Sequence, residues 1–101
     1  MKPVIFDAQL YSLPSTNAWV FVSLPLDASD EIRERTSVPR PGFGSVYVTA
    51  TIGSTTWTTS IFPESGGGPY VLPVKKTVRL AEGIAVGDTA TVTVEIDLSR
   101  Y

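Results

Sequence analysis

The chain has 101 residues, of which 43% are apolar and 18% charged. This length and composition predict one folded domain, residues 1–101, with a single hydrophobic core, and they exclude a disordered chain. The formal net charge is -2, which argues against nucleic acid as a partner unless the charges are strongly segregated. Cysteine and histidine are absent, so disulfides, Cys/His zinc sites, thiol nucleophiles and Ser-His-Asp triads are excluded.

Targeting and membrane segments are not recognisable in the sequence. Asp7 interrupts the start of the chain before any long apolar stretch of the kind found in signal peptides. No run approaches the ~20 apolar residues of a membrane-spanning helix. We therefore expect a cytoplasmic protein that makes no contact with membranes.

Alternation of apolar and polar residues predicts short strands along most of the chain. The apolar run at 18–24 predicts a strand with Trp19 in the core, whereas Trp57 lies among threonines and is expected to be half-exposed. The dipeptide Gly53-Ser54 predicts the turn of a hairpin. The expected strands are 4–11, 18–24, 45–52, 55–62, 70–74 and 89–98.

Two short helices are predicted, at 27–35 and 75–83. Asp27 or Ser29 is expected to cap the first helix, and Gly83 to end the second in a left-handed conformation. Both helices are too short to be stable alone, so they must dock on the sheet. Two helices and about six strands predict a mainly β protein, a small closed or partly open β-barrel, with a two-sheet sandwich as the alternative.

Six motifs in the same order along the chain resemble those of a known family. The motifs are Trp19-Val20-Phe21-Val22, Asp30-Glu31-Ile32-Arg33, Pro41-Gly42-Phe43-Gly44-Ser45-Val46, Thr58-Thr59-Ser60-Ile61-Phe62-Pro63, Tyr70-Val71-Leu72-Pro73-Val74-Lys75, and Ala81-Glu82-Gly83 with Val86-Gly87-Asp88. Over nearly its whole length the chain resembles the bacterial family DUF1905, a domain of unknown function. The resemblance implies a compact β-barrel with short helices, and it implies no activity.

Candidate site residues are suggested by position, because no nucleotide-binding or catalytic motif is present. Arg40 and Phe43 flank a Pro/Gly segment that would let a ligand approach the backbone closely. Lys75 opens a helix, where an anion would be stabilised; in the alternative interpretation this lysine lies in solvent. The predicted ligand-binding set is Arg40, Phe43, Trp57, Ser60, Phe62, Tyr70 and Lys75.

The acidic residues do not predict a metal site. The acid cluster is Asp27, Asp30, Glu31 and Glu34. Three of these, Asp27, Glu31 and Glu34, share a face at helical spacing, and Arg35 is expected to pair with Glu31, as on a solvated helix end. The ligand spacing of a calcium loop is absent. We expect no metal and no cofactor.

Two functions remain open at this point. The favoured one is a noncatalytic module that binds an apolar or anionic small molecule, or a protein partner. The alternative is a small cofactor-independent enzyme, of isomerase or cyclase type, with a buried carboxylate, Tyr70 or Lys75 as proton carrier. The burial of ionisable groups distinguishes the two functions, since a carboxylate or lysine enclosed in an apolar cavity would favour the enzyme.

Overall fold

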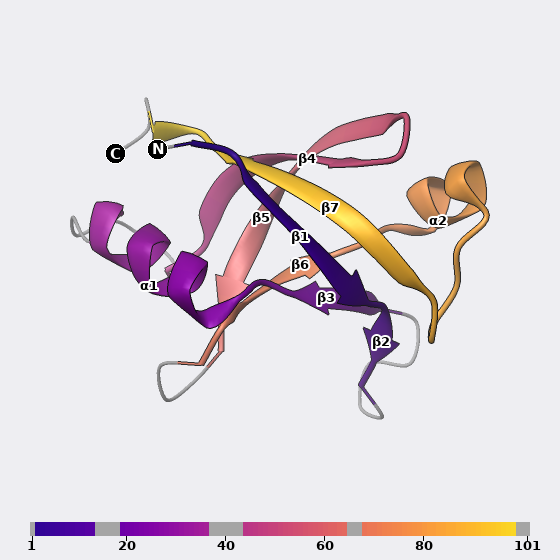
Figure 1. Ribbon diagram of the computed structural model, residues 1–101, viewed down its shortest axis with the longest axis horizontal. Coiled ribbons are helices and arrows are strands. Elements are labelled where there is room, and N and C mark those ends of the chain that lie inside the picture. The colour runs from indigo at the N-terminus through magenta and orange to yellow at the C-terminus, as the bar shows by residue number, and fades with distance from the viewer. Residues whose placement is uncertain (1, 14–18, 37–43, 65–67, 99–101) are drawn as a thin grey trace.

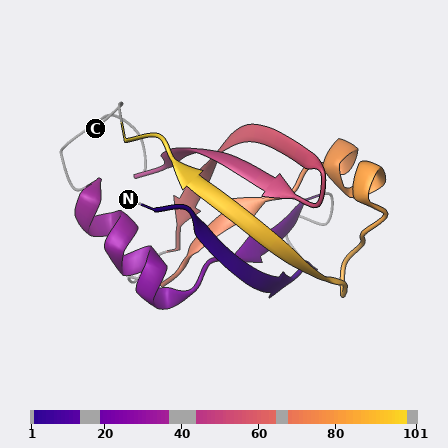
Figure 2. The same cartoon turned by 45° about the horizontal axis from the view of Figure 1, so that its top comes forward.

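The protein forms a curled, mainly β structure with two short helices (Figures 1 and 2). The computed structural model describes residues 2–13, 19–36, 44–64 and 68–98. The elements are β1 (Val4–Gln9), β2 (Tyr11–Ser12), β3 (Val20–Ser23), α1 (Leu26–Arg35), β4 (Val46–Ile52), β5 (Thr55–Pro63), β6 (Tyr70–Pro73), α2 (Lys76–Glu82) and β7 (Thr89–Ile96).

All strand pairs are antiparallel, and the strands form one sheet in the order β1-β7-β4-β5-β6-β3-β2. The sheet curls into a nearly closed barrel, which confirms the predicted fold class and replaces the two-sheet alternative (Figure 2). The expected first strand is in fact two, because Leu10 leaves the ladder. Its N–H donates to the carbonyl of Asp88, and its own carbonyl accepts from Gly87 N–H, both at 2.9 Å.

The predicted hairpin is confirmed in detail. Strands β4 and β5 pair from Val46–Ile61 to Ile52–Thr55. The turn requires a positive φ at Gly53, which is +60°, and glycine adopts this conformation without a Cβ penalty. The hairpin supplies the longest continuous stretch of paired strand in the barrel wall.

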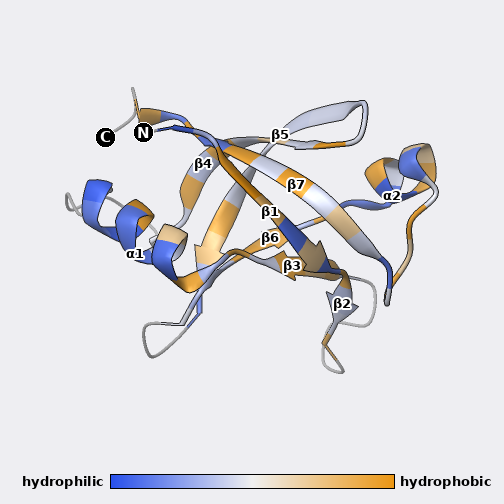
Figure 3. Ribbon diagram, viewed as in Figure 1, coloured by the Kyte–Doolittle hydropathy of each residue, from blue (hydrophilic) through white to orange (hydrophobic). Residues whose placement is uncertain are grey.

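The core fills the interior of the barrel from all sides. Along β4 and β7 the buried residues alternate with exposed or half-exposed ones, as Figure 3 shows by the orange bands on these ribbons. The apolar side of each strand therefore faces the interior, because successive side chains of a strand point to opposite faces. The apolar residues that are buried are Phe6, Leu10, Val20, Val22, Leu24, Ile32, Val46, Val48, Ala50, Ile52, Trp57, Ile61, Tyr70, Leu72, Val74, Val78, Ala90, Val92 and Val94.

The two tryptophans exchange the places predicted for them. Trp19 is 56% exposed, so its assignment to the core is wrong, and Trp57 is only 7% exposed. In β3 the inward positions are Val20 and Val22, which puts Trp19 on the outer face. Trp57 points inward opposite Ala50, whose small side chain leaves room for an indole.

The helices lie at opposite ends of the barrel (Figure 1). The predicted capping of α1 is confirmed only in part: the N-cap is Pro25, which has no side-chain cap, but Asp27 Oδ1 accepts from the first-turn N–H of Ala28 at 2.8 Å. Ser29 is fully buried and does not cap the helix. Helix α2 ends, as predicted, at Gly83 with φ of +64°. The side of α2 that packs on the barrel is narrow: Val78 is buried and Ala81 is exposed. Neither of these helices has the length and apolar character that crossing a bilayer requires.

Candidate functional site

The structure separates the predicted site residues. Arg40 and Phe43 lie outside the described residues. Trp57 belongs to the barrel interior, and Tyr70 is 3% exposed in the core beneath α1. The other three, Ser60, Phe62 and Lys75, line surface clefts. The seven residues therefore do not form one site in the part of the chain that the structure describes.

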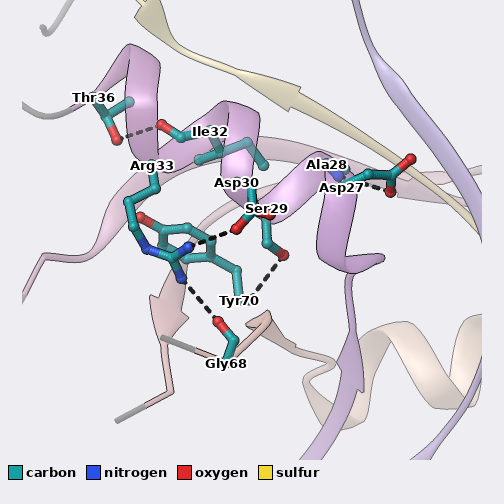
Figure 4. Close-up of polar contacts among 9 residues, drawn as sticks. All are labelled: Asp27, Ala28, Ser29, Asp30, Ile32, Arg33, Thr36, Gly68 and Tyr70. Atoms are coloured by element: carbon teal, nitrogen blue, oxygen red, sulfur yellow. Dashed lines mark hydrogen bonds and ion pairs between the residues drawn. The ribbon is translucent and has the colours of Figure 1, made fainter. Parts of the chain in front are cut away.

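Tyr70 serves a structural junction between α1 and β6 (Figure 4). The guanidinium of Arg33 lies over the tyrosine ring, 5.4 Å from its centroid, and donates to the carbonyl of Gly68 at 2.8 Å. The backbone N–H of Tyr70 donates to the buried Ser29 Oγ at 3.0 Å. These contacts explain the burial of Ser29, and they place Tyr70 in the joint that holds α1 against the sheet.

Lys75 lies in a cleft of about 210 Å³ near the start of α2. We call this the cationic cleft, because every charged side chain that lines it, among the residues described, is basic. Arg79 is held there by a hydrogen bond from its Nε to the carbonyl of Val74, at 3.1 Å. The lining residues are Trp19, Val20, Pro73, Val74, Lys75, Lys76 and Arg79.

Ser60 and Phe62 line a second, more open cleft of about 520 Å³. We call it the hydroxyl cleft, after the Thr and Ser side chains along its floor. Thr49, Thr58 and Ser60 come from the outer faces of β4 and β5, where Thr49 pairs with Thr58 and Tyr47 with Ser60. The lining residues are Trp19, Tyr47, Val48, Thr49, Thr58, Thr59, Ser60, Phe62 and Asp97.

Trp19 borders both clefts and is the outermost ring of an aromatic row. Its indole stacks on Phe21 with 6.1 Å between ring centroids and 18° between planes. Phe21 in turn contacts Tyr11 across the β2–β3 pair, also at 6.1 Å. The Tyr11 hydroxyl and Ser23 Oγ share a hydrogen bond of 2.9 Å. The indole thus packs against Phe21 on one side, while more than half of its surface stays exposed.

Sequence reasoning missed Trp19 as a surface residue, although one signal pointed to it. Ser23 has the same parity along β3 as Trp19 and Phe21. A polar residue at that parity marks the outer face, because successive side chains of a strand alternate between faces. The apolar character of the whole run at 18–22 concealed this signal.

Charged side chains gather near both helices, which lie at opposite ends of the molecule (Figure 1). At one end Lys75, Lys76 and Arg79 surround the cationic cleft. At the other, α1 carries four carboxylates and two arginines. As predicted, Glu31 pairs with Arg35, at 3.2 Å. Three basic side chains therefore lie near Trp19, although α2 also carries Glu82 and Asp97 lines the neighbouring cleft.

The ionisable groups have the exposure of a surface rather than of an enclosed catalytic centre. All ten carboxylates fall within the described ranges, and each is exposed or half-buried. Lys2, Lys75 and Lys76 are exposed. Among the residues described, no three carboxylates gather closely enough to hold a metal ion.

These observations define a small barrel-shaped β protein with aromatic and cationic side chains gathered on its outer surface. The chain belongs to the DUF1905 family, a domain of unknown function, whose family model matches residues 6–94. This match confirms the resemblance seen in the six motifs. No curated protein matches the chain.

Proposed function

We propose that this protein is a noncatalytic binding module whose cationic cleft takes a small, flat, apolar anion. The observation that carries the proposal is the exposed Trp19 indole beside a cleft whose charged residues are all basic. An indole that is 56% exposed on a protein surface offers apolar area that a ligand can cover.

The cleft suits such a ligand in size and chemistry. A volume of about 210 Å³ accommodates a fragment of one or two rings rather than a larger molecule. Val20, Pro73 and Val74 supply an apolar floor. Lys75 and Lys76 supply ammonium groups at the rim, where hydrogen bonds to a carboxylate or phosphate are strengthened by charge. The ring supplies buried area, and the anion fixes the orientation.

The exposure of the ionisable groups favours this module over the alternative enzyme. Proton transfer near neutral pH needs a carboxylate or lysine whose surroundings shift its affinity for protons. The carboxylates and lysines lie at the surface or half-buried. Tyr70 lies beneath Arg33 in the joint with α1 and borders neither cleft.

Titration with 2-naphthoate, followed by ¹H–¹⁵N correlation spectra, tests the proposal. The chain has two tryptophans, and only Trp19 borders the cleft. We expect the Trp19 Nε1–H signal and the Lys76 backbone amide to move, while the Trp57 Nε1–H signal stays in place. The buried indole thus serves as an internal control in the same spectrum.

Two comparisons test whether the anion and the cleft matter. The isosteric neutral 2-naphthamide should shift the same signals only at much higher concentration. Lys75→Met should weaken naphthoate binding, and Lys2→Met, which removes the same charge elsewhere, should not. The proposal is rejected if naphthoate leaves Trp19 unmoved, or if the amide binds as well as the acid.

A further inference from the structure

We propose that the two clefts together bind a short stretch of single-stranded nucleic acid, with Trp19 as a base-stacking platform between them. This inference rests on the proposed function, because each nucleotide combines a flat ring with an anionic group. It adds the class of ligand and extends the site into the hydroxyl cleft.

The first observation in favour of this ligand is that Trp19 lines both clefts. One indole borders both the cationic cleft and the hydroxyl cleft, so a ligand with several flat units can pass from one to the other across it. A single small ring would leave the larger cleft, of about 520 Å³, unused. A polymer in which flat groups alternate with anions matches two adjoining clefts, one aromatic and hydroxyl-lined and the other basic.

The second observation is that exposed aromatic rings, on which bases could stack, line the hydroxyl cleft. Trp19 is 56% exposed and Phe62 is 41% exposed, and both line the hydroxyl cleft. Barrel proteins bind single strands by stacking successive bases on such rings, because every base has a π face. The support of Trp19 by Phe21 and Tyr11 holds the platform in one orientation before the ligand arrives.

The third observation is that three basic side chains line one cleft, where they could bind phosphates. A net charge of -2 argues against nucleic acid only while the charges are evenly mixed. Here Lys75, Lys76 and Arg79 line the cationic cleft together, and the carboxylate of α2, Glu82, does not line it. The acidic helix α1 lies at the far end of the barrel (Figure 1). Phosphates are expected to follow the basic side, since Asp97 lines the hydroxyl cleft and would repel them.

The hydroxyl groups of the hydroxyl cleft can bind a nucleic acid strand without selecting a particular base sequence. Thr58 and Ser60 both lie on the outer face of β5 and can donate to or accept from sugars and base edges. A hydroxyl rotates to suit either role, so these contacts do not select one base strongly. We therefore expect binding with weak sequence preference and a preference for unpaired strands.

Fluorescence anisotropy with a short fluorescein-labelled oligothymidylate tests the inference. Trp19→Ala should weaken binding by roughly five- to a hundredfold, the range for loss of one stacked base. Ile5→Ala removes a side chain that is 67% exposed on β1 and lines neither cleft, so binding should be unchanged. Circular dichroism confirms that each variant is folded.

Salt dependence separates specific phosphate binding from general attraction. The double variant Lys75→Met/Lys76→Met should reduce the slope of log affinity against log salt by about 0.7 for each phosphate that the lysines neutralise. Lys2→Met removes one positive charge outside both clefts and should leave the slope unchanged, so each single variant, Lys75→Met and Lys76→Met, is compared with it. A duplex of the same length should bind more weakly than the single strand.

Three results overturn the inference: no binding of the oligothymidylate at low salt, equal binding of the duplex, or equal binding by Trp19→Ala and the unsubstituted protein. The naphthoate titration distinguishes its failure from that of the proposed function. If naphthoate shifts Trp19 but the oligonucleotide does not bind, the nucleic-acid inference alone is wrong. If the oligonucleotide binds and naphthoate does not, the proposal of a small isolated anion is wrong.

Discussion

Replacement of each tryptophan by alanine should lower the free energy of unfolding by very different amounts. Trp57→Ala removes an indole that is 7% exposed and points into the barrel, whereas Trp19→Ala removes one that is 56% exposed. A buried tryptophan takes ~200 Å² out of water, worth about 5 kcal/mol, and core Trp→Ala changes cost about 3–5 kcal/mol. Ala50, the cross-strand neighbour of Trp57, has no side chain that could swing into the resulting cavity.

The expected loss for Trp19→Ala is much smaller. The main contact is the stack on Phe21, and an aromatic pair of this kind contributes about 0.5–1.5 kcal/mol. The free energies of unfolding of the two variants should therefore differ by roughly 2 kcal/mol or more.

Urea unfolding followed by circular dichroism measures both values, with the slope on urea checked for two-state behaviour. If Trp57→Ala does not fold, Trp57→Phe replaces it, with an expected loss of about 1–3 kcal/mol. Acrylamide should quench mainly the Trp19 emission in the unsubstituted protein. Equal losses for the Trp19 and Trp57 variants would refute the assignment of faces along β3 and β5.

Two further predictions concern the joints that hold the helices. Ser29→Ala leaves the buried N–H of Tyr70 without its acceptor, so unfolding should become easier by about 1–3 kcal/mol, whereas the exposed Ser54→Ala should change stability by about 0.5 kcal/mol at most. Gly53→Ala should cost about 1–2 kcal/mol from backbone strain at a φ of +60°. A further loss is expected because the new Cβ would displace the Glu82 carboxylate, which accepts from Thr55 Oγ1. Both losses are measured by urea unfolding. The contribution assigned to Glu82 is wrong if Gly53→Ala costs as much in a Glu82→Ala background, where only the backbone strain should remain.

Much of the local structure could be predicted from the pattern of residues. The β4–β5 hairpin follows from alternation on both sides of Gly53-Ser54, and α2 ends at Gly83 because glycine tolerates the left-handed conformation. In each case the deciding interactions are between near neighbours in the chain.

The candidate site could be predicted only in part, because its residues meet through the barrel. Lys75 and Tyr70 are close in sequence, but they lie at opposite ends of β6, and only Lys75 borders a cleft. Trp19 joins Lys75 there through the antiparallel pairing of β3 with β6, a contact between distant parts of the chain.

The sequence by itself determined which segments form strands and helices, that the protein is mainly β, and its membership of a family defined by ordered motifs. The tertiary structure alone decided which tryptophan is buried. The run at 18–22 is apolar at both parities, so Ser23 alone points to the outer face, and threonines, which suit either face, flank Trp57. Closure of the barrel resolved the choice, since inward Val20 and Val22 leave Trp19 no place except the outer surface.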